Sequence, residues 1–150
     1  FVRKIACDGS LQKNGISRIF ILDEKTSQIT ILMQQFVGSS KYPVYHRVEI
    51  IAAPMPTLMV NSILLSRDSV LLALITRVSV YVLDVNPRFL PEESSLESVI
   101  RPIYCAFDTS DIACGSAHSP GLLQVRWHPR QHNLLVVLTS NSTVLFVQCG

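Results

Sequence analysis

The sequence predicts an all-β fold on three observations. Its apolar runs are short and rich in Val, Ile and Leu, and Gly, Ser, Asn, Asp or Pro bound almost every one of them. No segment shows the sustained apolar spacing of an amphipathic helix. These runs predict strands near 2–7, 16–22, 28–34, 58–65, 70–76, 78–85, 101–107, 121–127, 133–139 and 143–149. Polar turn residues separate consecutive strands, for example at 66–69 and 140–142.

Composition and charge exclude several function classes. A length of 150 residues fits one domain, and 48% hydrophobic residues suffice for a core. The net charge is only +2 and Lys and Arg form no run, so we expect no direct nucleic acid contact. We expect no membrane insertion either, because the longest apolar run, 70–75, is far shorter than the roughly 20 residues that span a bilayer. Four cysteines without Cys-x-x-Cys spacing predict a reducing compartment, cytosolic or nuclear.

An internal repeat narrows the architecture. Residues 63–67 match 125–129, residues 71–76 match 134–139, and residues 81–83 match 145–147, with an offset that grows from 62 to 64. A shorter match joins 19–23 to 80–84. The recurring unit of three short antiparallel strands and a fourth is one blade of a β-propeller. The fourth strands are expected at 28–34 and 101–107.

The chain is therefore predicted to be a partial β-propeller. It supplies two to three blades, whereas closed propellers have roughly 4–8. Residues 1–150 are expected to form a portion of one propeller domain. Its loop insertions are expected near 38–57 and 86–120, which are rich in Pro, Ser and Gly. A β-sandwich of similar size is the alternative, and the repeat favours the propeller.

Histidines near one turn raise the question of a metal site. Cys114, His118, His128 and His132 have spacings that a zinc ion could use. However, Pro129 lies between the last two in a predicted tight turn, so they cannot share a helix face. Exposed loop histidines are the more economical interpretation, and we expect no metal and no cofactor.

The sequence matches known catalytic motifs only weakly. Residues 115–119 do not form the Gly-x-Ser-x-Gly elbow of hydrolases, and no Gly-rich phosphate loop occurs. A hydrolase that uses His118, His128 and Asp108 remains the alternative from a different functional class. The sequence favours a protein that is not an enzyme. Trp127, at the end of a presumed inner strand, is expected to be a core aromatic rather than an exposed binding anchor.

Four local features resemble the N-terminal β-propeller of the eighty-eight-kilodalton nucleoporin family, whose fungal counterpart is the eighty-two-kilodalton nucleoporin. In the family's order they are RIFILD at 18–23; YHRV at 45–48 leading through APMPT at 53–57 to VNSILLS at 60–66; VLLALI at 70–75 with VYVLDVNPRF at 80–89; and LLQVRWHP at 122–129 with LLVVLTSN at 134–141. The last feature is the most specific. The segment 90–120 carries no motif of the family.

The resemblance implies a structural nucleoporin at the cytoplasmic side of the nuclear pore complex in the nuclear envelope, where it supports nuclear export of mRNA and protein. It implies a docking module for other nucleoporins. These are the C-terminal domain of the ninety-eight-kilodalton Phe-Gly nucleoporin and, through a helical tail outside these residues, the two-hundred-and-fourteen-kilodalton nucleoporin. An unrelated propeller scaffold of the coat-complex type is the alternative. Because 86–120 interrupts the repeat, we expect a partner-binding loop there; its candidate residues are Leu90, Glu92, Glu93, Leu96 and Ile112.

Overall fold

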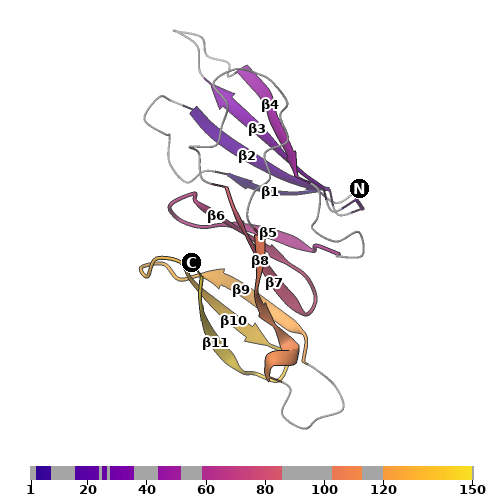
Figure 1. Cartoon of the computed structure of the whole chain (residues 1–150), viewed down its shortest axis with the longest axis vertical. Coiled ribbons are helices and arrows are strands. Elements are labelled where there is room, and N and C mark those ends of the chain that lie inside the picture. The colour runs from indigo at the N-terminus through magenta and orange to yellow at the C-terminus, as the bar shows by residue number, and fades with distance from the viewer. Residues whose placement is uncertain are drawn as a thin grey trace.

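Three antiparallel sheets follow one another along the long axis of the chain in the computed structural model (Figure 1). The structure describes residues 3–7, 16–23, 25–26, 28–35, 44–51, 59–85, 103–112 and 120–149. The first sheet has the strand order β1 (Arg3–Cys7), β2 (Ile16–Asp23), β3 (Gln28–Gln35) and β4 (Val44–Ile51). Each strand pairs with the next along the chain, so the sheet is a simple meander.

The middle and third sheets repeat this meander. The middle sheet contains β5 (Ser62–Leu65), β6 (Leu71–Ile75), β7 (Ser79–Asp84) and β8 (Ile103–Asp108), and a short 3₁₀ helix, η2 (Thr109–Ile112), follows β8. The third sheet contains β9 (Leu122–Trp127), β10 (Leu134–Thr139) and β11 (Val144–Gln148). None of the sheets closes on itself. The all-β prediction is confirmed, and the meanders have the form expected of propeller blades.

The longer repeat of the sequence corresponds to equivalent strands. The matched segments place β5 over β9, β6 over β10 and β7 over β11, each at the same position in its sheet. The shorter match of 19–23 with 80–84 is misleading, because β2 is the second strand of its sheet and β7 is the third. The same error affects the expected fourth strands. Residues 101–107 contain β8, which is a fourth strand, whereas 28–34 belong to β3, a third strand.

Strand β4 is the element that the sequence analysis missed. Residues 38–57 were expected to be a loop insertion, yet Val44–Ile51 within them pair with β3 from Gln35 to Ile29. The nearby prolines in the sequence suggested a loop, but the strand itself, Val44–Ile51, contains no proline. The register shifts between Ile31 and Leu32, so β4 is accommodated with a bulge. Residues 36–43 and 52–58 lie outside the described residues.

Apolar side chains between successive sheets form two separate cores. The first core joins the first and middle sheets; its buried members are Phe20, Leu22, Ile29, Ile31, Val60, Ile63, Leu72, Leu74, Leu83 and Val85. The second joins the middle and third sheets, and its buried members are Leu71, Ala73, Val80, Val82, Phe107, Val125, Leu135, Val137 and Cys149. Alternation along each strand sends neighbouring side chains to opposite faces. The middle sheet therefore contributes to both cores.

Arg18 is a buried cation at the contact between the first and middle sheets. Its side chain is 1% exposed and lies on β2, with its guanidinium carbon 5.0 Å from the centre of the Phe20 ring. One guanidinium nitrogen donates to the carbonyl of Val85, and the other donates to the carbonyl of Ser69 at 2.7 Å. A buried charge is tolerated where such bonds replace its hydration. Arg18 therefore links β2 to two points of the middle sheet.

The thiols of the described chain are free. Cys7 and Cys105 are exposed and Cys149 is buried in the second core. Burial raises the pKa of the Cys149 thiol. The pKa of Cys105 is also raised, first by partial burial and then by the nearby carboxylate of Asp108. In the described ranges, no helix is long and apolar enough to cross a bilayer.

Candidate functional site

Two turns from neighbouring sheets meet around a pocket. The turn between β5 and β6 and the turn between β9 and β10 enclose about 290 Å³. The pocket is lined by Ser66, Arg67, Asp68, Trp127, His128, Pro129, Arg130, Gln131, His132 and Asn133. It therefore includes the histidine-containing stretch that the sequence analysis singled out.

The turn of the middle sheet is fixed by its own polar side chains. Ser66 Oγ donates to Asp68 Oδ1 at 2.6 Å and accepts from the backbone N–H of Leu71 at 3.0 Å. Asp68 Oδ1 also accepts from the N–H of Val70 at 3.3 Å. Ser69 has a φ of 61°, a left-handed conformation that closes the turn. The turn thus presents Arg67 and Asp68 from a rigid frame.

In the third sheet, His128 takes the position that Ser66 has in the middle sheet. Its Nδ1 accepts from the N–H groups of Arg130 and Gln131 at 3.1 and 2.9 Å, so this nitrogen carries no proton and Nε2 does. Asn133, with a φ of 56°, closes the turn as Ser69 does in the other sheet. The histidine therefore supports the turn, as the repeat alignment predicted.

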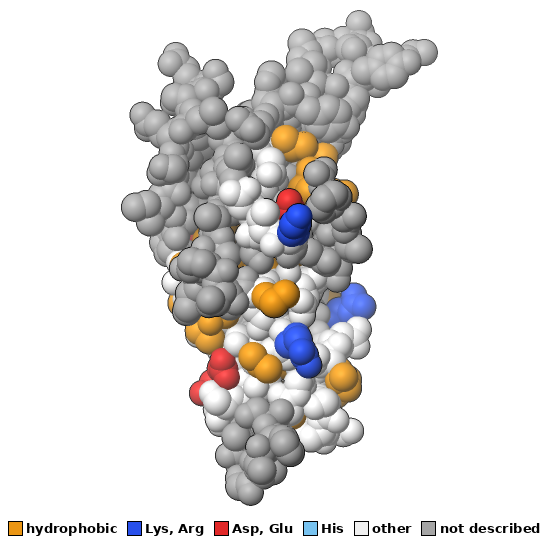
Figure 2. Space-filling model, turned by 90° about the vertical axis from the view of Figure 1, so that its right-hand side faces the viewer, with side chains coloured by type: hydrophobic (Ala, Val, Ile, Leu, Met, Phe, Trp, Pro, Cys, Tyr) orange, Lys and Arg blue, Asp and Glu red, His pale blue; other side chains and the backbone are white. Residues whose placement is uncertain are grey.

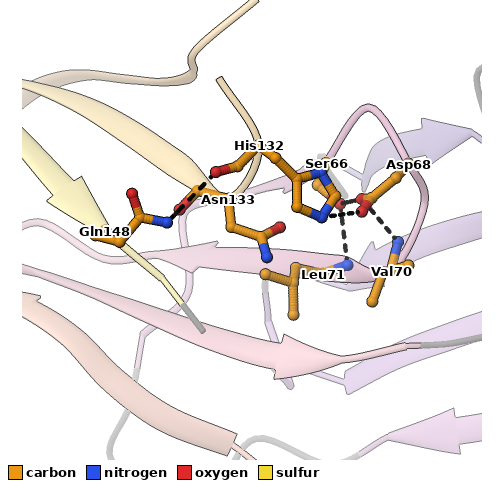
Figure 3. Close-up of polar contacts among 7 residues, drawn as sticks. All are labelled: Ser66, Asp68, Val70, Leu71, His132, Asn133 and Gln148. Carbon is orange, nitrogen blue, oxygen red and sulfur yellow. Dashed lines mark hydrogen bonds and ion pairs between the residues drawn. The ribbon is translucent and has the colours of Figure 1, made fainter. Parts of the chain in front are cut away.

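Three contacts join the two turns across the sheets. His132 Nε2 lies 2.9 Å from Asp68 Oδ2 (Figure 3), and Arg67 Nη1 donates to the carbonyl of Pro129 at 2.9 Å. The indole N–H of Trp127 donates to the carbonyl of Leu64 at 3.0 Å. Trp127 is half-buried against the second core, so the expectation of a core aromatic between sheets is confirmed. Side chains of both sheets hold the pocket together.

The arrangement does not support the metal hypothesis. The described residues contain no group of three or more His, Cys, Asp or Glu side chains that could hold a metal ion. His132 is engaged by Asp68, and Nδ1 of His128 is used by its own turn. Cys114 and His118 lie outside the described residues.

The residues of the hydrolase alternative are not brought together where they are described. Asp108 ends β8 beside the turn between β6 and β7, whereas His128 lies at the other end of the sheets. The carboxylate accepts from the N–H of Ser110 at 2.9 Å and from the hydroxyl of Ser79 at 2.8 Å. The hydrogen bonds from Ser110, and then that from Ser79, lower the pKa of Asp108. Asp108 therefore stabilises a turn far from His128.

Strand β8 divides the expected insertion 86–120 into two connections. The first joins Val85 to Ile103, and both of these residues lie at the pocket end of the middle sheet, because Val85 N–H bonds to Val70 O and Ile103 pairs with Leu83. Ile112 ends η2 at the other end of β8, about 20 Å away for a strand of this length. Leu90, Glu92, Glu93 and Leu96 lie outside the described residues, and their role stays a prediction.

On the outer face of the third sheet, the described residues leave apolar side chains of β10 and β11 partly exposed, beside the polar side chains of Gln124 and Arg126 on β9. Val136 faces Phe146 across the strands, and Leu138 faces Val144. Phe146 is 65% exposed and Val144 is 53% exposed. The same positions of the middle sheet are Ala73, Val82, Ile75 and Val80, of which Ala73, Val80 and Val82 are fully buried under the third sheet. The third sheet thus repeats a face that, in the middle sheet, serves as a contact with the next sheet.

Surface charge on the described residues is sparse and mixed. Figure 2 shows one side of the molecule, where Lys and Arg lie as separate spots among hydrophobic and neutral side chains. This agrees with the net charge of +2.

Comparison with known proteins agrees with the resemblance seen in the sequence. A search of the curated proteins found no match. The family Nup88, described as a nuclear pore component, matches residues 11–149, which include the strands from β2 to β11 and both turns of the pocket. The chain therefore belongs to the Nup88 family of nuclear pore components.

Proposed function

We propose that this chain is a structural docking module at the cytoplasmic face of the nuclear pore complex. It acts without catalysis and supports nuclear export of mRNA and protein by binding other nucleoporins. Membership of a family of nuclear pore components supports this role over that of a coat-complex subunit. The three meander sheets supply rigid ends from which loops can contact partners.

The observation that supports the proposed domain architecture is the exposed apolar surface on the outer face of the third sheet. Phe146 is equivalent to Val82 and Val144 to Val80, and both of these middle-sheet residues are fully buried. An exposed apolar surface of this kind marks a place where another layer or protein packs. We infer that residues 1–150 are consecutive blades of one N-terminal propeller domain, and that a further sheet covers this face.

The partner surface is proposed at the pocket end of the middle sheet. The connection that leaves at Val85 and returns at Ile103 carries Leu90, Glu92, Glu93 and Leu96. It begins and ends beside the turn at 66–70. We propose that this loop binds the C-terminal domain of the ninety-eight-kilodalton Phe-Gly nucleoporin. The two-hundred-and-fourteen-kilodalton nucleoporin would bind through a tail outside these residues.

Deletion of 91–99 from the full-length protein tests the docking loop. Co-precipitation of the ninety-eight-kilodalton nucleoporin from cell extract is expected to be lost in the deletion variant. Arg77→Glu, an exposed residue in the turn between β6 and β7 at the opposite end of the middle sheet, is the control and is expected to leave co-precipitation unchanged. Unchanged co-precipitation in the deletion variant would remove this loop from the interface, and absence of any nucleoporin with the unmodified protein would overturn the docking role itself.

A further inference from the structure

We propose that the pocket between the middle and third sheets binds an acidic segment of a protein partner, with an Asp or Glu carboxylate held between Arg67 and Arg130. The pocket lies at the end of the middle sheet where the docking loop begins. The proposal therefore rests on the docking role and names the chemistry that this end of the molecule recognises.

The side chains that line the pocket carry a net positive charge, because Arg67 and Arg130 face the single carboxylate of Asp68. Asp68 already accepts hydrogen bonds from Ser66 and Val70 and faces His132. Arg67 is exposed and uses one N–H for the carbonyl of Pro129. Within the described part of the chain, the exposed guanidinium of Arg130 makes no hydrogen bond or ion pair with a carboxylate or carbonyl. Two arginines from two sheets thus surround a space in which the carboxylate of Asp68 already accepts hydrogen bonds.

The other residues that line the pocket favour a peptide ligand over a small inorganic anion. The side-chain oxygen of Asn133 is buried and has no hydrogen-bond partner among the described residues. An amide oxygen is an acceptor, so it disfavours an anion and favours a ligand that also carries N–H donors. Trp127 and Pro129 add apolar surface to the lining. A peptide with an acidic and an apolar side chain matches all three features: its carboxylate fits the arginines, its backbone N–H groups fit the oxygen of Asn133, and its apolar side chain fits Trp127 and Pro129.

The pocket is organised before any ligand arrives. His132 and Asp68 fix the positions of the two turns relative to each other (Figure 3). The hydrogen bond from Trp127 to the carbonyl of Leu64 joins the two sheets next to these turns. A pre-organised site loses little conformational entropy on binding. Its volume of about 290 Å³ suits one side chain with adjacent peptide units rather than a folded domain.

Fluorescence anisotropy with the full-length protein tests this proposal. The probe is a short fluorescein-labelled peptide of Glu, Asp and Leu, and its counterpart carries Gln and Asn in place of the acids. The acidic peptide is expected to bind more tightly, with an affinity that falls as salt rises. Arg130→Glu is expected to weaken binding about tenfold, because it replaces an attraction by a repulsion. Arg67→Gln should weaken it in the same direction, and circular dichroism checks that both variants are folded.

Arg77→Glu is the matched control, because Arg77 is exposed in the turn between β6 and β7 at the opposite end of the middle sheet. Equal affinity for the two peptides would overturn the proposal, as would a loss of binding in Arg77→Glu as large as that in Arg130→Glu. Displacement of the peptide by inorganic phosphate would identify a simple anion site, and tighter binding of an oligouridine RNA would identify a nucleic acid site; either result also overturns it. Co-precipitation of nucleoporins, measured in parallel, reports separately on the docking role.

Discussion

Replacement of Arg18 by alanine tests whether the first and middle sheets are joined by polar as well as apolar contacts. The substitution removes a buried guanidinium that donates to the carbonyls of Val85 and Ser69 and lies 5.0 Å from the Phe20 ring. It leaves two carbonyl oxygens without these donors and a cavity beside Phe20. The described contacts of Arg18 connect segments 51 and 67 residues apart in the sequence, so the variant loses long-range links.

The magnitude follows from these contacts. Each hydrogen bond from a charged donor contributes about 1.5–3 kcal/mol, and a cation over an aromatic ring about 0.5–2 kcal/mol. Part of this stabilisation is offset, because water hydrates the guanidinium in the unfolded state. We expect Arg18→Ala to lower the free energy of unfolding by about 3 kcal/mol. For a chain of this length, that corresponds to a fall in Tm of about 6–12 °C.

Urea unfolding followed by far-UV circular dichroism, which reports on all three sheets, together with thermal unfolding, measures the effect. Arg18→Lys keeps the charge and the aliphatic stem but cannot span both carbonyls from one ammonium group, so an intermediate loss is expected. Arg77→Ala, an exposed arginine in a turn, is expected to change stability by less than about 0.5 kcal/mol. A variant Arg18→Met as stable as the unmodified chain would refute the reasoning, because the cost of burying the cation would then equal the value of its bonds.

Three further predictions concern other contacts. Asp108→Asn should make the free energy of unfolding depend less on pH in the acid range. Folding lowers the pKa of Asp108, so its carboxylate stabilises the fold above the ordinary value of 3.8, and this contribution is lost as the pH falls below that value. Unfolding measured across a pH series checks this. Cys149, buried and with a raised pKa, should react with iodoacetamide far more slowly than exposed Cys7, as mass spectrometry of the native protein would show. Trp127→Phe removes the bond to Leu64 O and should cost about 1–2 kcal/mol in urea unfolding; no loss would mean that this bond is not formed in solution.

The strands and turns of the second half were predictable because their signals are local. The polar turns at 66–69 and 140–142 separate apolar runs, and the offset of 62 to 64 residues gave the order of equivalent strands. Strand β4 was missed because prolines near both of its ends outweighed the β-branched residues between them. The match of 19–23 to 80–84 was misleading because most strands share the same apolar composition, whatever their position in a sheet.

The site could be predicted only in part. The stretch at 127–132 stood out through its tryptophan and histidines, and its position in a turn followed from the alignment with Ser66. Its partners could not be found in the same way, because the contact of His132 with Asp68 and the bond of Arg67 to Pro129 depend on how two sheets are placed. The role of Arg18 was missed for the same reason: its acceptors are backbone carbonyls, which leave no pattern in the side-chain sequence.

The middle sheet is covered on both faces, whereas the first and third sheets each share one described core with it. This gives the described chain the cooperativity of a linear array, in which each unit is stabilised by its nearest neighbours. Local opening should begin in the flanking sheets and reach β6 and β7 last, so amide hydrogen exchange should be slowest there. A variant that weakens one inter-sheet core would then uncouple a single flanking sheet while the other two stay folded.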